Sequence, residues 1–182
     1  MAILPITLYG DTILRKKAKK IEQIDDSLIG FIADMFETMH NANGIGLAAN
    51  QVNSDLSLFI VDLSVMDEFK DIKPITLINP EIIEESEETA IFEEGCLSLP
   101  NLRADVERPE IIRVKYLDVN ENEQILEADD LLARVILHEY DHLIGKMIPD
   151  RVDPKSKKKL QNLLSKISKR TMDFDYPVSE RC

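Results

Sequence analysis

The sequence predicts an α+β domain, in which the strands of a mixed, largely antiparallel sheet system pack around a central helix. Two observations support this prediction. Amphipathic helical patterns occur early and late in the 182-residue chain, and strand-like runs occupy its middle. No repeat or low-complexity linker divides the sequence. We therefore expect residues 1–182 to form a single domain with N- and C-terminal helices and a flexible tail over 171–182.

The first helix is predicted to begin after Asp25–Ser27, a polar cluster whose side chains can cap free backbone N–H groups. Apolar residues then recur at helical spacing between Leu28 and Met39, so this helix should end near residue 40. A glycine-rich stretch, residues 43–51, separates it from the strands.

Three β-branched or alternating runs, separated by polar turns, predict strands at residues 58–62, 75–79 and 111–117. The polar segment 120–122 should turn the third strand into a short return strand at 123–126. The middle of the chain is therefore expected to supply the sheet.

Two helices are predicted after the strands. The first should begin at Asp129 or Asp130 and stop at Gly145, because glycine readily adopts the backbone conformation that ends helices. The second begins with Asp153, a capping residue, and Pro154, which is favoured in a first turn. Its buried stripe is made of Leu160, Leu163, Leu164 and Ile167.

The composition excludes several classes of protein. The net charge of −12 disfavours an autonomous nucleic-acid-binding protein, and we expect no contact with DNA. No apolar run approaches the ~18 residues that a membrane span needs, so we expect no membrane contact. The first residues lack the features of a secretory signal, and Cys96 and Cys182 do not suggest a disulfide framework. We therefore expect a cytoplasmic protein, with Cys182 as a free thiol.

His138 and His142 lie four residues apart in the helix predicted to end at Gly145, so both imidazoles can reach one metal ion. Glu139, beside the first histidine, can then act as a base on a metal-bound water. A chance pattern on a solvated helix is the weaker interpretation, because two of the chain's three histidines fall into this pattern. The third, His40, is interpreted as a cation at the end of the first helix.

Cys96 is the candidate third ligand. A lone cysteine is usually a small buried apolar residue, but this one follows a glycine, has acidic neighbours and precedes a proline that ends the segment. A thiolate suits iron(II), zinc or nickel. Two histidines and one cysteine also leave a coordination position open, which is typical of a catalytic metal site.

Gly44 and Gly46 do not belong to a phosphate-binding loop or a dinucleotide motif, since the later glycine and the lysine of those motifs are missing. Alternating glycines do allow the backbone of a peptide to approach closely, as when an extended peptide adds to a sheet edge. Gln51 follows, and its amide can donate to an oxyanion, although an ordinary surface glutamine is the alternative interpretation.

Three segments together resemble the signature motifs of the peptide deformylases, in both order and spacing. They are the glycine-rich segment 44–51, the cysteine segment 94–98 and the histidine segment 138–142. The opening segment 9–15 is similar to the start of the family, so the resemblance runs to about residue 152. One such motif is moderate evidence by itself, whereas three in this order, with one cysteine and two histidines in the ligand positions, are strong evidence.

The resemblance implies a bacterial-type cytoplasmic hydrolase that removes the formyl group from the N-terminal formylmethionine of newly synthesised polypeptides. A metal-bound water would attack the formyl carbonyl, with Glu139 as the general acid/base. Gln51 and the backbone N–H of Leu97 would form the oxyanion hole. One divalent metal ion is implied, iron(II) before zinc or nickel, and its ligands would be Cys96, His138 and His142.

The resemblance also implies a substrate cleft. The edges along the extended peptide would be Gly44, Ile45, Gly46 and Leu47 on one side and Glu94 and Gly95 on the other. The methionine pocket would be formed by Ile45, Phe92, Leu131, Val135 and the ring of His138. Asn50, Arg134 and Leu137 depart from the family's common pattern. We expect these three to alter the shape of the pocket and to touch neither a ligand nor the acid/base.

Charge patterns support three further interpretations. Residues 151–170 carry eight basic residues and one acidic residue, which we interpret as a solvated helix face, with contact to ribosomal RNA as the sharper hypothesis. The acidic run 81–94 is interpreted as a solvated strand edge that resists aggregation. A Glu94–Arg108 pair is predicted to brace the cysteine loop, whereas Asp141 points elsewhere on its helix and receives no role.

Two other functions stay open. The histidine motif also marks zinc metallopeptidases, although these commonly take a downstream glutamate or histidine as the third ligand, where this chain offers an upstream cysteine. A domain that binds peptide N-termini or stores metal without turnover is the other alternative. Such a domain needs neither Glu139 nor Gln51.

Overall fold

The computed structural model describes residues 2–180, and Cys182 lies outside this range. The helices within it are α1 (Asp26–Asn41), α2 (Asp130–Leu143) and α3 (Pro154–Lys169). The strands are β1 (Gly46–Ala48), β2 (Leu58–Val61), β3 (Ile75–Glu85), β4 (Thr89–Cys96), β5 (Leu99–Pro109), β6 (Ile111–Leu117) and β7 (Glu123–Asp129). A short 3-10 turn, η2 (Ala49–Val52), follows β1.

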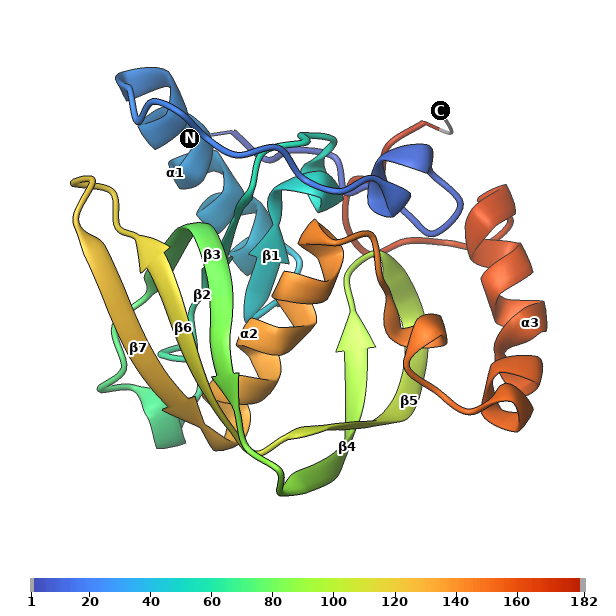
Figure 1. Ribbon diagram of the computed structural model, residues 1–182. Helices are drawn as coiled ribbons and strands as arrows, with labels where there is room; N and C mark the ends of the chain where they lie inside the picture. The colour runs from blue at the N-terminus through green and yellow to red at the C-terminus, as the bar shows by residue number, and fades with distance from the viewer. Residues whose placement is uncertain (1, 181–182) are drawn as a thin grey trace.

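Strands β1, β2, β3, β6 and β7 form one sheet in the order β1-β2-β3-β6-β7, and β4 pairs with β5 in a separate hairpin. The named strands pair antiparallel, and within residues 2–180 parallel pairing is confined to isolated bridges such as Ile6–Val178. Helix α2 lies between the sheet and the hairpin (Figure 1). The predicted α+β class, with largely antiparallel strands around a central helix, is confirmed.

The helix ends follow the predicted capping chemistry. The side chain of Asp25 accepts a hydrogen bond from the N–H of Leu28, and Asp153 caps the first turn of α3. Gly145 follows α2 with a φ of +74°, and a Cβ atom there would lie 2.6 Å from the carbonyl oxygen of Arg15. Glycine is therefore required at this helix end for both conformation and space.

The strands were only partly predictable. Each predicted run contains a strand, but β3 and β7 extend further along the chain, and β1, β4 and β5 were not predicted. The glutamates of the acidic run 81–94 are exposed, as expected, with one exception. Glu94 is the exception, because it is only 6% exposed and pairs with the buried Arg108 of β5. Charged residues facing inward hide the alternation that identifies a strand.

The apolar core covers both faces of the five-stranded sheet, with α2 packed on one face and α1 on the other. Phe59, Val114 and Ile136 belong to the cluster between the sheet and α2. Met35 and Ile60 belong to the cluster beneath α1. Because α2 is packed on several sides, its central residues are held in fixed positions, which a metal or catalytic site requires.

The last described residues, 171–180, run alongside the N-terminal segment. The N–H of Ile6 donates to the carbonyl of Pro177 (2.9 Å), and the N–H of Ser179 donates to the carbonyl of Ile6 (2.9 Å). Phe174 and Tyr176 pack partly buried against the cluster that includes α3. This segment therefore makes specific contacts with the body of the protein.

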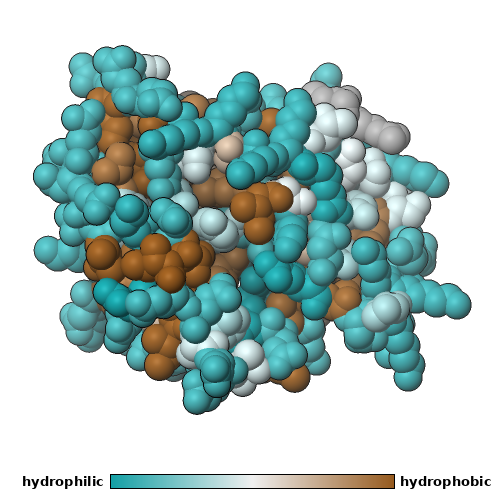
Figure 2. Space-filling view, viewed as in Figure 1, coloured by the Kyte–Doolittle hydropathy of each residue, from teal (hydrophilic) through white to brown (hydrophobic). Residues whose placement is uncertain are grey.

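Hydrophilic side chains cover most of the face shown in Figure 2, and those on the α3 side extend furthest from the surface. Apolar groups interrupt this cover in separate places, one of them over the strands at the left of the view. Across residues 2–180, no helix has the length and apolar character needed to cross a membrane.

Candidate metal centre

The three predicted ligands come together where the end of β4 meets α2. His138 and His142 project from one face of α2, and Cys96 is the last residue of β4. One donor atom from each of the three lies within 4.8 Å of the others, and Cys96 Sγ is 3.2 Å from His142 Nε2. One thiolate and two imidazoles are a donor set for divalent transition metals, and three ligands leave a position for a water or substrate atom.

Their surroundings shift the pKa values of the two histidines in opposite directions. Burial lowers the pKa of His142 well below its usual value, so its ring is neutral, as a ligand must be. Burial also disfavours the charged form of His138, but hydrogen bonds to Cys96 and Glu94 outweigh burial and raise its pKa. The site thus favours a positive charge between the cysteine sulfur and His138. A divalent cation bound there would supply this positive charge.

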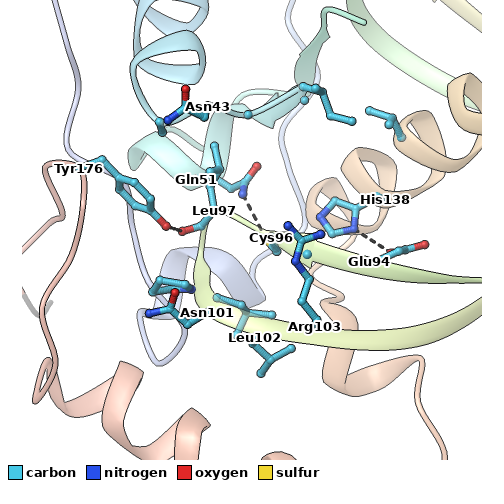
Figure 3. A pocket seen from close by; sticks show the side chains of 18 of the residues that line it. Asn43, Gln51, Glu94, Cys96, Leu97, Asn101, Leu102, Arg103, His138 and Tyr176 are labelled. Atoms are coloured by element: carbon cyan, nitrogen blue, oxygen red, sulfur yellow. Dashed lines mark hydrogen bonds and ion pairs between the residues drawn. The ribbon is translucent and has the colours of Figure 1, made fainter. Parts of the chain in front are cut away.

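Glu94 orients His138 from behind. The Nδ1 atom of His138 is 3.0 Å from Glu94 Oε2, which directs Nε2 towards the cleft (Figure 3). Arg108 donates two hydrogen bonds to the same carboxylate, at 2.6 and 3.0 Å. Burial alone would raise the pKa of Glu94, but the bonds from His138 and Arg108 outweigh burial and hold it far below its usual value. The predicted Glu94–Arg108 pair is present, and it contacts a candidate ligand.

Asp141 extends this set of charges, although it received no role from the sequence. As helical geometry predicts, it points away from the metal ligands, and there it accepts a hydrogen bond from Arg108 (2.8 Å). Arg151 donates to the same carboxylate. A chain of alternating charge therefore runs from the buried Glu94, Arg108 and Asp141 to the partly exposed Arg151, and it fixes the cysteine hairpin against α2.

The expectation that the departures from the family pattern touch no ligand is wrong for Asn50. Its Nδ2 atom donates to the backbone carbonyl of His142 at 2.6 Å, because η2 packs against the end of α2. Arg134 donates to Glu94 at 3.0 Å and so acts on His138 through that carboxylate. Leu137 packs in the core, in agreement with the expectation.

Glu139 follows the candidate ligand His138 on α2, and its buried carboxylate has properties that suit proton transfer. The residue is 4% exposed, and among the described residues its Oε2 atom has no hydrogen-bond partner. Burial raises the pKa of Glu139 to about 7. A group with such a pKa can both accept and release a proton near neutral pH. Gly46 packs directly on it, since a Cβ atom at that position would lie 2.5 Å from Glu139 Oε1.

Gln51 is held with its NH2 group towards the cysteine. Its Oε1 atom accepts from the N–H of Ala48 (2.8 Å), while Nε2 donates to Ser98 Oγ (3.2 Å) and to Cys96 Sγ (3.5 Å). Because the residue is 1% exposed, the interpretation as an ordinary surface glutamine is wrong. Leu97 follows Cys96 in the turn between β4 and β5 (Figure 3).

A cleft of about 590 Å³ opens beside these groups. It is walled by β1 and its preceding loop, by the cysteine hairpin and by α2. The predicted site residues that line it are Gly44, Ile45, Gly46, Gln51, Glu94, Gly95, Cys96, Leu97, Leu131, Val135, His138 and Glu139.

Three predicted site residues are absent from the lining of this cleft: the buried ligand candidate His142, Leu47 and Phe92. Side chains alternate along a strand, so Gly46 faces Glu139 and Leu47 faces the core beneath α1, where it is fully buried. Phe92 is 52% exposed and lies under the guanidinium of Arg134, 5.0 Å away, in a separate hollow. Arg134 lines both spaces.

Comparisons with known proteins agree with this geometry. The family described as polypeptide deformylase matches residues 3–158. The chain belongs to the polypeptide deformylase family. A peptide deformylase from Cytophaga hutchinsonii is 46% identical over 176 residues, covering 96% of this chain and 95% of that protein. One from Chlorobium phaeovibrioides is 43% identical, covering 99% and 94%. The crystal structure of a Synechococcus elongatus peptide deformylase in complex with actinonin has a TM-score of 0.81 at 40% identity, covering 97% and 92%.

Family membership establishes the activity. The chain is a metal-dependent hydrolase that removes the N-terminal formyl group from formylmethionine of newly synthesised polypeptides. The cofactor is a divalent metal ion, for which the Cys96, His138 and His142 group is the candidate site.

The deformylase cleft also contains residues that the sequence did not single out. Arg103 lies over Gly95, where a Cβ atom would be 2.9 Å from its Cζ. The C-terminal segment contributes a further wall, made of Asp173, Phe174, Asp175 and Tyr176. The glycine before Cys96 is the one sequence signal of such a close approach. The C-terminal wall has no local motif.

Proposed function

We propose that Cys96, His138 and His142 hold the divalent metal of this deformylase and that Glu139 is its general acid/base. The observation that carries the assignment is the buried carboxylate of Glu139, whose Oε2 atom has no partner among residues 2–180, beside the three converging donors. When bound, the metal supplies a Lewis acid that lowers the pKa of water and polarises the formyl group.

Glu139 accepts the proton of the attacking water and delivers it to the departing amine. Its raised pKa, about 7, suits both transfers at neutral pH. Gly46 leaves no room for this carboxylate to rotate towards β1. The proton therefore moves at a fixed position next to the ligands.

Gln51 and Leu97 donate hydrogen bonds to the formyl oxygen as negative charge develops on it. The amide of Gln51 is fixed by three contacts before substrate binds, so little reorganisation is needed in the transition state. The backbone N–H of Leu97 lies in the turn next to Cys96. Both donors are thus positioned by the same hairpin that carries the cysteine ligand.

The substrate peptide lies extended along β1. This strand is at the edge of its sheet, and the preceding loop residues Gly44 and Ile45 line the cleft. An edge strand offers free backbone groups to an added strand. Glu94 and Gly95 lie across the cleft from it, and Leu131 and Val135 with the ring of His138 line the space for the methionine side chain.

Iron(II) is the metal we propose for the protein in the cell, with zinc and nickel as alternatives for a ligand set of this kind. The thiolate of Cys96 supplies electron density that supports a soft divalent ion. We propose the cytoplasm as its location, because formylated chains emerge there, and residues 1–182 as a single catalytic domain.

Ribosome contact through the basic segment 151–170 is a further proposal. Arg151 and Arg170 are engaged in ion pairs with the buried carboxylates of Asp141 and Asp11, so they contribute less to a surface for RNA. The exposed lysines are Lys155, Lys158, Lys159, Lys166 and Lys169. Ribosome pelleting that weakens steeply with salt, and is lost when these lysines become glutamine, supports the proposal, whereas salt-independent pelleting refutes it.

The function is tested with formyl-Met-Ala-Ser and its acetylated counterpart, using protein purified without oxygen and loaded in turn with iron(II), nickel or zinc. Release of formate from the first peptide alone supports the assignment. Cleavage of an internal peptide bond in a longer substrate favours a metallopeptidase. Metal binding without turnover of any peptide favours a binding domain.

A further inference from the structure

Three separate segments hold the turn that joins β4 to β5. The N–H of Tyr9 donates to the carbonyl of Ser98 (2.9 Å), and Gln51 donates to the hydroxyl of Ser98 (3.2 Å). The hydroxyl of Tyr176 donates to the carbonyl of Leu97 at 2.6 Å (Figure 3). Each contact fixes a different group of the turn, and those from Tyr9 and Tyr176 hold backbone carbonyls.

The hydrogen bond from Tyr176, unlike the other two, comes from the C-terminal region of the chain. Tyr176 lies beyond residue 158, where the match to the family ends. Its segment is tied to the N-terminal part of the chain, because Ile6 bonds to Pro177 and to Ser179, which both follow Tyr176. Tyr176 is partly buried and also lines the cleft. A fixed segment of the C-terminal region therefore reaches the backbone beside the cysteine ligand.

We propose that Tyr176 is a positioning residue for deformylation, acting through Leu97. On its N-terminal side Leu97 is fixed by Cys96, which pairs with Leu99 in the hairpin. On its C-terminal side the bond from Tyr176 holds its carbonyl. With both sides restrained, the backbone of Leu97 is held, and with it the direction of its N–H. The inference rests on the proposed role of that N–H as an oxyanion donor.

The side chain of Tyr176 has no role in proton transfer under this proposal. Removal of its hydroxyl leaves the ligands, Glu139 and Gln51 in place and frees the Leu97 carbonyl to rotate. A donor that is poorly aimed loses part of the ~10²–10³-fold that a complete donor contributes. We therefore expect Tyr176→Phe to lower kcat by about 3- to 10-fold, with KM changed by less than about twofold.

The experiment compares Tyr176→Phe with Tyr116→Phe in the metal-loaded full chain. Tyr116 is also partly buried, but it packs in the cluster between the sheet and α2, away from the cleft. Steady-state deformylation gives kcat and KM, and hydrogen–deuterium exchange reports the backbone of Leu97 and Ser98. The proposal predicts a lower kcat and faster exchange at the turn in Tyr176→Phe only.

Several results overturn the proposal. An unchanged kcat with a lower thermal midpoint assigns Tyr176 to stability alone, and a raised KM at constant kcat assigns it to substrate binding. Equal effects of the two variants also refute it. If the wild type releases no formate, the proposed function fails, and the exchange rates at Leu97 still decide whether Tyr176 restrains the turn.

Discussion

Removal of the Arg108 guanidinium should break the buried ion pairs that hold His138 in place. We consider Arg108→Met, which keeps the apolar part of the side chain and removes the guanidinium. Arg108 is 4% exposed and makes two hydrogen bonds to Glu94 and one to Asp141. Its loss leaves two buried carboxylates without their shared partner.

The loss of stability depends on the ion pairs that Glu94 and Asp141 each keep. Breaking a buried ion pair by removal of one partner costs roughly 3–5 kcal/mol of the free energy of unfolding. Glu94 keeps its bond to Arg134, and Asp141 keeps its bond to Arg151, which is partly exposed. We therefore expect a loss near the lower limit, about 3 kcal/mol. Metal affinity should fall by about 10- to 100-fold, because Glu94 loses the group that orients it towards His138.

The assay is urea unfolding of metal-free and metal-loaded protein, with metal content measured by competition with a chelator. Arg113→Met is the matched control, since Arg113 pairs with Glu84 at 2.9 Å on an exposed surface. Its loss should cost at most about 0.5 kcal/mol. If Arg108→Met loses less than about 1 kcal/mol and keeps its metal affinity, the buried charges do not brace the site.

Three further predictions follow from single contacts. Gly46→Ala should lower kcat at least tenfold in the deformylation assay, because its Cβ would lie 2.5 Å from Glu139 Oε1. The control Gly30→Ala, whose Cβ would have nothing within 4 Å, should raise the free energy of unfolding by about 0.5–1 kcal/mol. A normal kcat for Gly46→Ala would contradict the close packing of Gly46 on Glu139. Gln51→Ala should lower kcat about 10²-fold with metal still bound, and full activity would exclude it as an oxyanion donor. Hydrogen bonds from Ser64 and His40 outweigh burial and lower the pKa of Asp62, so its stabilisation is present above pH ~4 and lost as the pH falls further. Asp62→Asn should flatten the acid side of the stability–pH curve, and an unchanged curve contradicts this.

The sequence allowed the prediction of elements whose signals are local. The caps at Asp25 and Asp153 and the glycine after α2 mark helix ends by short-range chemistry. The spacing of His138 and His142 places both rings on one helical face without knowledge of the fold. For these features, neighbouring residues contain all the necessary information.

The remaining features depend on contacts between distant residues. Glu94, Arg108 and Asp141 are charged types that are usually exposed, and only their mutual pairing makes burial favourable. The same inward charges concealed β4 and β5. Tyr176 reaches Leu97 across 79 positions of sequence. No periodicity or motif within either segment indicates such a contact.

The role of Glu139 is the central claim, and single-turnover deformylation by Glu139→Gln tests it most directly. Glutamine keeps the size of the side chain but cannot accept and return a proton. We expect the rate of formate release from formyl-Met-Ala-Ser to fall by at least about 10²-fold, with one metal ion still bound to each chain. A rate near that of the wild type, with metal bound, would contradict the account.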